Sequence, residues 1–374
     1  MHWASATLRT APHLETYAVK QINVGIIGTG WCGGIRADTC AINPAVKDLH
    51  IVETRPERLA EVAKSCNAKT ATDDYHKLLE VKDLDAVMIS ATPEKLHFPM
   101  ARDCLERGLH VFMEKPIAVE LHEADELIAI AKRKNVKFTI GYSQRFNPKF
   151  AYVRKAIREG SIGRPVSALV SRHITRSLGK KISGRVKLSP AAMESTHDLD
   201  FLLWCLEPSK PVRVYSQNNY GVMKESSGQE IPDTQWITVT MDNGLSFVVG
   251  GGWNLPPGYP NFSTTWIEMV GTEGVIMVDD SHRDVVLNTM NKGMVLPMST
   301  MPGEGVDHTY AGPMAAETIH FLEAVACDRE VLVTPEHARM VMEVYIAADL
   351  SAERNEPVSL PLPQLGAKPV RAVA

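Results

Sequence analysis

The sequence predicts an α/β domain with a parallel sheet, followed by an α+β domain with a large, mostly antiparallel open sheet. In the first part, short apolar runs alternate with amphipathic segments of helical period, which is typical of βαβ units. After about residue 145 the pattern changes to successive strand-like runs joined by short polar or glycine turns, which is typical of antiparallel sheets. We therefore expect a loose arm over residues 1–20, a first domain over 21–145 and a second domain over 146–374.

The elements of the first domain follow from apolar runs and helix-start signals. The stretch "INVGIIGTG" (22–30) is continuously apolar and ends in glycines, which favours a buried parallel strand. In "RPERLAEVAKSC" (55–66) a proline precedes residues of helical period, which favours a helix start. In order, we expect strands at 22–30, 48–53, 83–91, 109–114 and 136–142, with helices at 33–43, 55–66, 95–108 and 120–135 between them.

The second domain is predicted in the same way. "DNG" at 242–244 lies between two strand-like runs and indicates a hairpin. "AAMESTHDLDFLLW" (191–204) has helical character, although it places charged residues among large apolar ones. We expect strands at 164–174, 212–220, 234–241, 244–253, 263–271 and 274–280, and closing helices at 313–327 and 335–353.

Composition and charge argue against several classes of protein. Hydrophobic residues are 44% and charged residues 22% of the 374 residues, as in ordinary globular proteins. The net charge of -4 gives no reason to expect nucleic-acid binding. No apolar run approaches the roughly 20 residues of a membrane span, so no membrane association is expected. Residues 1–20 lack the apolar core of a signal peptide, which favours a cytoplasmic protein.

Cysteines and histidines show no ligand spacing. The 6 cysteines form neither a C-x-x-C pair nor a paired framework, so we expect reduced thiols. The 13 histidines likewise show no H-x-x-x-H spacing. We therefore expect no metal site.

A glycine motif follows the first predicted strand. Gly28, Gly30 and Gly33 have G-x-G-x-x-G spacing, and here the motif ends a strand and opens a helix. The glycines allow a tight turn and close approach of a pyrophosphate, to which the helix N-terminus offers free N–H groups. The loop 28–33 also contains Thr29, Trp31 and Cys32, and we expect all six residues to line a nucleotide site.

The end of the second strand bears on the choice of cofactor. Glu53 lies 25 residues after Gly28, where an acid can accept hydrogen bonds from the ribose hydroxyls. An acid there repels a 2′-phosphate, so NAD is favoured over NADP. Arg55 is close enough to weaken that preference, although a solvated residue at a helix start is an equally good interpretation.

Further motifs resemble one known family. "ISATPEKLH" (89–97), "FMEKPIA" (112–118) and "STHDLDFLLW" (195–204) follow the glycine motif in the order found in the Gfo/Idh/MocA oxidoreductases. The resemblance covers roughly residues 21 to 360. It implies a Rossmann domain, a C-terminal α/β domain whose open sheet makes homodimers or homotetramers, a nicotinamide cofactor, and substrates among sugars, cyclitols and related hydroxy compounds.

The resemblance also implies roles for individual residues. Glu114, Lys115 and Pro116 match an E-K-P motif whose lysine reaches the substrate near the nicotinamide. Thr92, Pro93 and His97 match a segment beside the cofactor, and Arg145 matches an "RF" stretch at the domain junction. The resemblance implies that these four residues, with Glu114 and Lys115, contact the cofactor. His197 matches the histidine of the second catalytic motif.

One position departs from the family pattern. Many members carry Asp four residues before this histidine and Gly two before it, where this chain has Met193 and Ser195. The orienting partner of His197 is therefore open between Glu194, Asp200 and neither. Glu194 is also a candidate for substrate binding.

Lys115 and His197 suit the chemistry of alcohol oxidation. Hydride leaves carbon while a base takes the hydroxyl proton, and a base with a pKa near operating pH works best, which favours histidine. A lysine ammonium beside the same oxygen stabilises developing negative charge. Glu114 and Lys115 could instead form an exposed ion pair, and His197 could be a hydrogen-bonded core residue.

Two other features are candidates for substrate contacts. From Gly160 to Met193 the chain has no acidic residue, and this stretch predicts either a site for an anionic group of the substrate, with Arg172 as a ligand, or a solvated loop. Its basic residues are Arg164, Arg172, Arg176, Lys180, Lys181, Arg185 and Lys187. In "GGGWNLPPGYP" (250–260), Trp253 and Tyr259 could stack on a sugar or lie at a subunit interface.

The sequence thus predicts an NAD-dependent dehydrogenase acting on a secondary alcohol of a sugar, cyclitol or glycoside. Three alternatives stay open: redox-neutral glycoside cleavage or isomerisation with recycled NAD, oxidation of dihydrodiols, and a non-catalytic regulator that senses a nucleotide. The retention of both Lys115 and His197 argues against the regulator.

Overall fold

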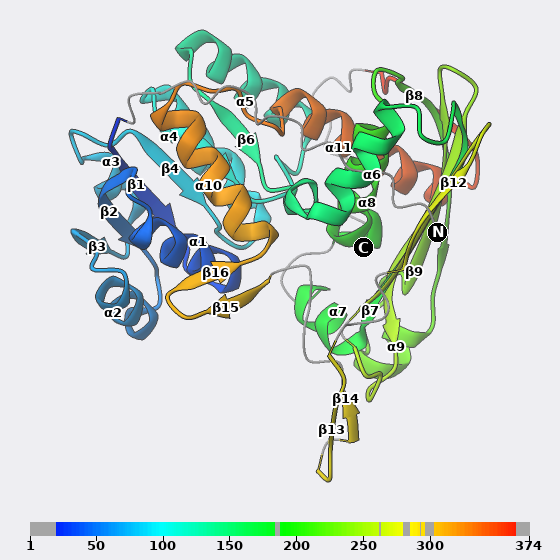
Figure 1. Cartoon of the computed structure of the whole chain (residues 1–374), viewed down its shortest axis with the longest axis horizontal. Helices are drawn as coiled ribbons and strands as arrows, with labels where there is room; N and C mark the ends of the chain where they lie inside the picture. Colours follow the sequence, from blue (N-terminus) through cyan, green and yellow to red (C-terminus); the bar gives the residue numbers. More distant parts are fainter. Residues whose placement is uncertain are drawn as a thin grey trace, which may run out of the picture.

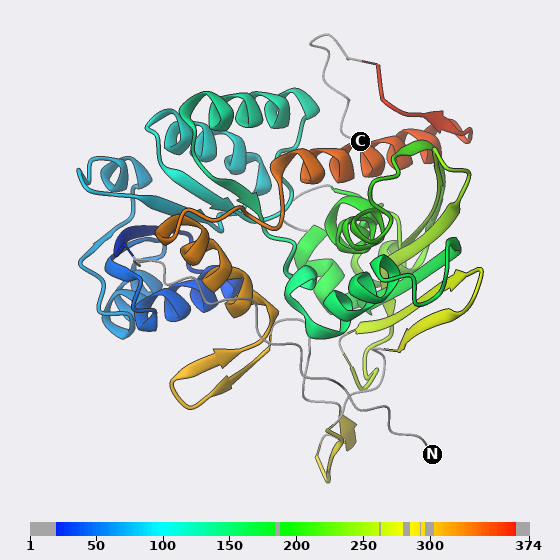
Figure 2. The ribbon, with the colours of Figure 1, turned by 45° about the horizontal axis from the view of Figure 1, so that its top comes forward.

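The computed structural model describes residues 20–183, 188–261, 263–279, 285–291, 293–295 and 303–363. Two sheets, each with its own helices, stand side by side (Figures 1 and 2). The predicted arm over residues 1–20 lies outside the described residues except for Lys20, whose ammonium pairs with Asp85 at 2.8 Å.

The first sheet is parallel and has the strand order β3-β2-β1-β4-β5-β6. Its strands are β1 (Ile22–Ile27), β2 (Val46–Val52), β3 (Thr70–Thr72), β4 (Ala86–Ile89), β5 (His110–Met113) and β6 (Phe138–Ile140). The helices around it are α1 (Trp31–Ile42), α2 (Pro56–Ser65), α3 (Tyr75–Leu79), α4 (His97–Glu106) and α5 (Leu121–Lys134). The order reverses between β1 and β4, and ligands of such sheets bind in the crevice at the carboxyl ends of the strands there.

Burial explains why these strands form. Every residue of β1 and β4 is buried, because helices cover both faces of the sheet. All five predicted strands and four predicted helices are present. The sequence prediction missed β3 and α3.

The second sheet has the order β12-β11-β7-β10-β9-β8-β17, and only its β7–β10 pair is parallel among the described strands. Its strands are β7 (Pro165–Thr175), β8 (Pro211–Asn219), β9 (Thr234–Met241), β10 (Ser246–Leu255), β11 (Ser263–Gly271), β12 (Val275–Asp279) and β17 (Val358–Ser359). The described elements thus confirm an α/β domain with a parallel sheet and a second, mostly antiparallel sheet. The predicted hairpin at 242–244 joins β9 to β10.

Among the described residues, helices cover one face of the second sheet and none covers the other (Figure 1). They include α6 (Pro148–Arg158), α8 (Thr196–Cys205) and α11 (Pro335–Arg354), which contact one another or the sheet. Two short helices, α7 (Arg176–Ser183) and α9 (Val222–Ser227), lie at one end of the sheet. Two small hairpins pair β13 (Leu287–Thr289) with β14 (Gly293–Val295) and β15 (Glu304–Val306) with β16 (Thr309–Ala311).

The chain returns to the first sheet near its end. Helix α10 (Pro313–Ala326) packs against α1, and Phe321 and Leu322 share a core with Ile22 and Val24. The domain boundary at residue 145 stays a prediction, but residues far beyond it complete the packing of the first sheet. Among the described residues, no helix combines the length and apolarity needed to cross a membrane.

Candidate active site

The glycine turn lies at the carboxyl end of β1, beside the reversal in strand order. Gly28 has a φ of 83°, which only glycine adopts readily. A Cβ on Gly33 would lie 1.9 Å from the carbonyl oxygen of Gly28, whereas a Cβ on Gly30 would have no protein atom within 4 Å. Gly33 is therefore needed for packing of the turn against α1, and the space above Gly30 is open to a ligand at the helix N-terminus.

We expect alanine to have opposite effects at these two glycines. Gly33→Ala should lower the melting temperature by several degrees, because its Cβ would collide with backbone. Gly30→Ala should leave the melting temperature unchanged but weaken NADH binding about tenfold or more, because its methyl group would occupy the ligand's space. Thermal melting and NADH titration of both variants check this, and wild-type NADH affinity in Gly30→Ala would contradict it.

Glu53, the predicted ribose ligand, is buried at the end of β2 and bound by protein groups. Its carboxylate accepts hydrogen bonds from the Thr29 N–H at 2.9 Å, the Thr29 hydroxyl at 2.8 Å and the Arg55 guanidinium at 2.9 and 3.0 Å. The hydrogen bonds from Arg55, with those from Thr29, lower the pKa of Glu53 to about 2. Glu53 thus fixes the glycine turn as an anion at neutral pH, and its contact with the ribose stays a prediction.

A cavity of about 380 Å³ opens beside this turn. Its lining residues are Thr29, Gly30, Trp31, Gly34, Ile35, Asp38, Arg55, Arg58 and Tyr310. Glycine backbone, two arginines and aromatic side chains suit the phosphates and rings of a nucleotide. The residues present therefore fit NAD, which the glycine turn and the two arginines would hold.

A buried arginine supports the segment after β5. The Arg36 guanidinium binds Glu114 at 2.5 Å, Glu317 at 3.0 Å and the Thr318 hydroxyl at 3.0 Å, and it lies over the Phe112 ring. Burial raises the pKa of Glu317 to about 8, and nearby Glu114 adds to this against the opposing effect of Arg36. Arg36 therefore ties α1 and α10 to the residue before Lys115.

Sequence reasoning missed Arg36. A usable signal was present, because Arg36 lies one helical turn before Cys40 on the face of α1 that becomes buried. A charge on a buried face needs partners.

Lys115 joins the two parts of the site. It follows β5 and is half-buried, and its ammonium donates to the carbonyl oxygen of Met193 at 2.5 Å. Met193, the position that departs from the expected motif, contacts Lys115 through its backbone carbonyl. This contact brings together the segments at 112–118 and 191–204, which lie far apart in the sequence.

The sequence pattern predicts a helix over 191–204, but this segment is not one regular α-helix. Ala191–Ser195 forms a π-helical turn, and α8 continues from Thr196. The extra residue per turn shifts residues 191–195 relative to the helical wheel that an uninterrupted α-helix would give. Such turns are frequent at functional sites.

His197 lies in the first turn of α8, edge-on to the Tyr142 ring at 5.9 Å between ring centroids. Its Nδ1 is buried without a hydrogen-bond partner among the described residues. Burial, with the charges of Lys115 and Arg172, lowers the pKa of His197 well below its usual value. The imidazole is therefore neutral at pH 7, as a proton acceptor must be.

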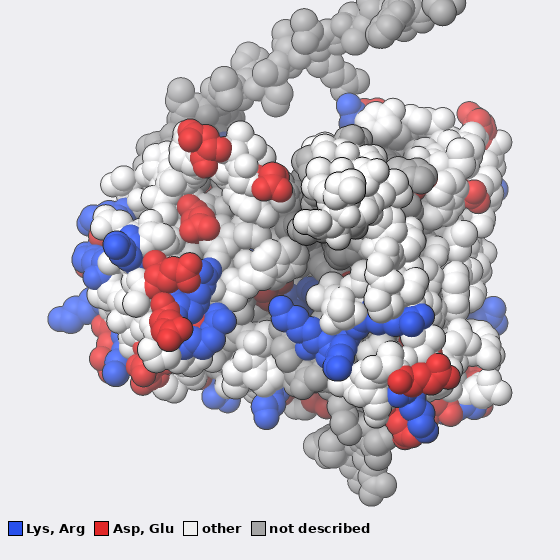
Figure 3. Space-filling model, turned by 90° about the horizontal axis from the view of Figure 1, so that it is seen from below, with Lys and Arg blue, Asp and Glu red and all other residues white. Residues whose placement is uncertain are grey.

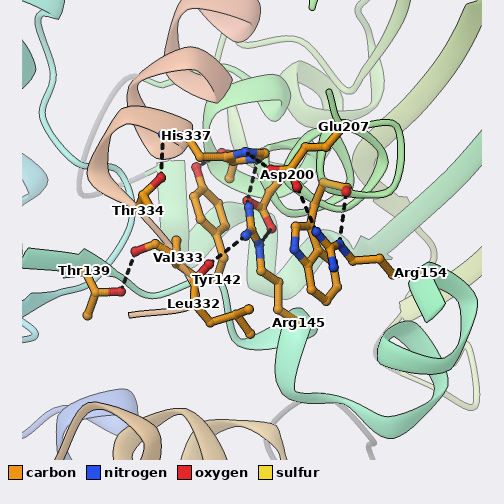
Figure 4. A network of polar contacts seen from close by, with 12 residues as sticks. Thr139, Tyr142, Arg145, Arg154, Asp200, Glu207, Leu332, Val333, Thr334 and His337 are labelled. Atoms are coloured by element: carbon orange, nitrogen blue, oxygen red, sulfur yellow. Dashed lines mark hydrogen bonds and ion pairs between the residues drawn. The ribbon is translucent and has the colours of Figure 1, made fainter. Parts of the chain in front are cut away.

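Neither candidate partner hydrogen-bonds the imidazole of His197. Asp200 is bound instead by the Arg145 guanidinium at 2.6 and 2.9 Å, and it lies 3.3 Å from His337 (Figure 4). Although burial works to raise the pKa of Asp200, Arg145 and His337 hold it below its usual value. Asp200 thus belongs to a separate network that joins α8 to α11.

Glu194 lies in the π-helical turn and is half-buried. Burial raises the pKa of Glu194, with a contribution from Asp198, against the opposing charges of Lys115 and Arg172. A carboxyl group that holds a proton more readily can both donate to and accept from a substrate hydroxyl. Its predicted substrate contact stays a prediction.

The two predicted arginines are committed to buried ion pairs. Arg172 binds the Asp198 carboxylate at 2.8 to 3.1 Å, and both side chains are almost completely buried. Arg145 binds Asp200, donates to the Leu332 carbonyl at 3.1 Å and stacks on Trp204. Both residues thereby hold α8, while their predicted contacts with substrate and cofactor stay predictions.

Other candidates are placed as follows. His97 is buried and bridges the carbonyls of Pro116 and Ala91 at 2.8 and 3.1 Å, so it joins the Thr92–Pro93 segment after β4 to the segment of Lys115. For Trp253 both alternatives, sugar stacking and a subunit interface, are wrong, because the side chain is completely buried and donates to the Pro232 carbonyl at 2.8 Å.

The basic stretch divides between buried and exposed residues. Lys180 and Lys181 are exposed on α7, and Arg176 donates to the Asn254 carbonyl at 3.1 Å. Lys and Arg side chains gather beside the groove that separates the part of the molecule built on the first sheet from the part built on the second (Figure 3). Arg185 and Lys187 lie outside the described residues.

Neither metal site nor disulfide is formed within the described residues. No group of three or more His, Cys, Asp or Glu there could hold a metal ion, and the six cysteines are free thiols. A larger cavity of about 540 Å³ lies over α6, lined by residues including Arg145, Arg154 and Trp204 but neither Lys115 nor His197.

A parallel sheet of order 3-2-1-4-5-6 with a glycine turn after its first strand defines a class, the dinucleotide-binding Rossmann proteins. The family follows from sequence models. Residues 22–142 match the oxidoreductase family with an NAD-binding Rossmann fold, and residues 154–360 match its C-terminal α/β domain. The chain belongs to this family, Gfo/Idh/MocA, and is an NAD-dependent oxidoreductase.

Similar proteins include several inositol dehydrogenases. A Bacillus subtilis scyllo-inositol 2-dehydrogenase (NAD(+)) is 25% identical over 91% of this chain and 96% of its own. A Thermotoga maritima myo-inositol 2-dehydrogenase is 24% identical over 73% of this chain and 79% of its own.

Solved structures share the fold. A Lactobacillus casei scyllo-inositol dehydrogenase with bound NAD(H) and scyllo-inositol has a TM-score of 0.77 at 21% identity, covering 91% of this chain and 99% of its own. GenD2 from gentamicin A biosynthesis, in complex with NAD, has a TM-score of 0.80 at 20% identity, covering 95% of this chain and 100% of its own.

Proposed function

We propose that the protein transfers hydride between a secondary alcohol of a cyclitol, sugar or glycoside and NAD, with Lys115 and His197 acting on the hydroxyl. The contact between the Lys115 ammonium and the Met193 carbonyl carries this proposal. It joins the segment after β5, at the ligand-binding edge of the first sheet, to the turn that precedes His197. The named inositol dehydrogenases among the relatives support the substrate class.

The residues act on one oxygen in this mechanism. His197 is neutral and accepts the hydroxyl proton, while the Lys115 ammonium donates to the same oxygen and stabilises its developing charge. NAD, when bound, supplies the hydride acceptor. Tyr142 and the Arg172–Asp198 pair keep His197 and α8 in place, so little reorganisation is needed during the reaction.

Absorbance at 340 nm with NAD and a panel of inositols, sugars and glycosides tests the function. We expect NADH to appear with at least one cyclic polyol. Product without net NADH would show that NAD is recycled, as in glycoside cleavage or isomerisation. Turnover restricted to dihydrodiols would show that the substrates are dihydrodiols and not cyclitols, sugars or glycosides. NAD binding without turnover of any compound would overturn the proposal in favour of a nucleotide-sensing regulator.

We also propose that a second copy of the chain covers the bare face of the second sheet, giving a homodimer or homotetramer in the cytoplasm. Trp236 and Trp266 lie on this face, 38% and 37% exposed, in one row across the sheet with Gly250 and Ser171 between them. Large apolar side chains gathered on an open face favour a protein interface.

The double variant Trp236→Glu/Trp266→Glu should reduce the mass measured by light scattering to that of one chain, because charges would be buried unpaired. Tyr152→Glu, at an exposed tyrosine of α6, serves as the control. A double variant with the mass of the wild type would contradict this interface.

A further inference from the structure

The β15–β16 hairpin lies far from the second sheet that precedes it in the chain. It follows the strands of that sheet in sequence, but Figures 1 and 2 show it beside the helices of the first sheet. Strand β16 contacts α1, and α10 follows it directly and packs along α1. The hairpin is therefore anchored against the helix that begins at the glycine turn.

Within this hairpin only one side chain is protected from solvent. Residues 304–309 and Ala311 are exposed, whereas Tyr310 is half-buried. The Tyr310 hydroxyl donates to the Gly303 carbonyl at 3.1 Å, which fixes the orientation of the ring. A two-stranded hairpin is marginally stable by itself, so contacts with α1 and at Tyr310 hold it in place.

Tyr310 faces the cavity of about 380 Å³ beside the glycine turn. It shares this cavity with Gly30 and Trp31 at the start of α1, and with Arg55 and Arg58 at the start of α2. The cavity thus has free N–H groups at a helix N-terminus, two guanidinium groups and the ring of Tyr310. Donors of this kind bind phosphates, and aromatic rings stack on bases.

We propose that Tyr310 is a cofactor-binding residue, which holds the adenosine diphosphate half of NAD against the glycine turn. This inference rests on the proposed nucleotide site and adds to it a ligand that lies more than 275 residues from Gly30 in the chain. Because the ring is oriented before NAD binds, little conformational freedom is lost on binding. The hairpin thereby gives the second part of the chain a contact with the cofactor.

This arrangement has a consequence for release of the cofactor. The nucleotide would lie between α1 and the hairpin, and it would have to break the Tyr310 contact before leaving. Loss of the contact should therefore appear mainly as faster dissociation, as for most changes at a binding interface.

The test compares NADH binding by wild type, Tyr310→Ala, Tyr310→Leu and Tyr310→Phe, with Tyr220→Ala at an exposed tyrosine as the control. Fluorescence titration gives the Kd, stopped-flow displacement gives the dissociation rate, and competition gives the Kd of ADP-ribose. We expect about a tenfold higher Kd for NADH and ADP-ribose in Tyr310→Ala and Tyr310→Leu, mostly from faster dissociation. Tyr310→Phe should stay within about threefold of wild type because it keeps the ring.

Wild-type affinities in Tyr310→Leu would overturn the inference, even if Tyr310→Ala proved unstable. A change in NADH affinity without a change for ADP-ribose would also contradict it, by placing Tyr310 away from the adenosine half. Wild type that binds NADH but oxidises no polyol would overturn the proposed function and leave this inference intact. Wild type that binds no NADH would overturn both.

Discussion

Lys115→Ala is expected to lower kcat about a hundredfold to a thousandfold while leaving the Kd for NADH within about threefold of wild type. The Lys115 side chain is half-buried between β5 and the π-helical turn, where its ammonium donates to the Met193 carbonyl. In the proposed mechanism its positive charge stabilises the transition state more than the bound alcohol, so we expect its removal to act on kcat. Steady-state kinetics and NADH titration measure the two quantities.

Two controls separate this role from a general effect of charge. Lys132→Ala removes an exposed lysine that pairs with Glu336 and should leave both quantities unchanged. Lys115→Arg keeps the charge but changes the donor geometry, and should recover only part of the rate. Unchanged turnover in Lys115→Ala would exclude the proposed catalytic role.

His197→Gln is expected to lower kcat about a hundredfold to ten-thousandfold, because glutamine cannot accept the hydroxyl proton. A matched control is His122→Gln, which changes an exposed histidine at the start of α5. Comparable rates in wild type and His197→Gln would show that another group accepts the proton.

The pH profile gives an independent test of the same residue. A base must be unprotonated, so kcat/KM rises with pH through the pKa of the free enzyme's base. Burial and the charges of Lys115 and Arg172 lower the pKa of His197, so wild-type activity should persist as pH falls through 6.5. An acid limb centred above pH 6.5 would contradict this assignment.

Local patterns predicted most of the fold. The strand β1 and the helix α1 were expected because an apolar run, a glycine turn and helical period follow one another. Strand β3 and helix α3 have only 3 and 5 residues, too few for a periodic pattern to emerge. The burial of Trp253 could not be predicted from its local sequence either, because Trp253 packs against Met193 and Met223, which are distant in the chain.

The candidate site was predicted motif by motif but not as a network. Lys115 and His197 were found because each lies in a recognisable motif. Lys115 reaches the turn before His197 through the backbone carbonyl of Met193. A backbone contact of this kind cannot be predicted from the type of side chain at that position. The Arg36–Glu317 pair joins residues 281 positions apart, so sequence spacing could not reveal it.

The proposed function requires hydride to pass from an alcohol carbon of the substrate to NAD. Inositol deuterated at its ring carbons tests this step, when deuterium in the cofactor is measured during a single turnover of the enzyme with NAD. We expect deuterium to appear at C4 of the nicotinamide, and we expect Lys115→Ala and His197→Gln, with NAD still bound, to transfer it far more slowly. Product formation with no deuterium in the cofactor would show that hydride does not take this path.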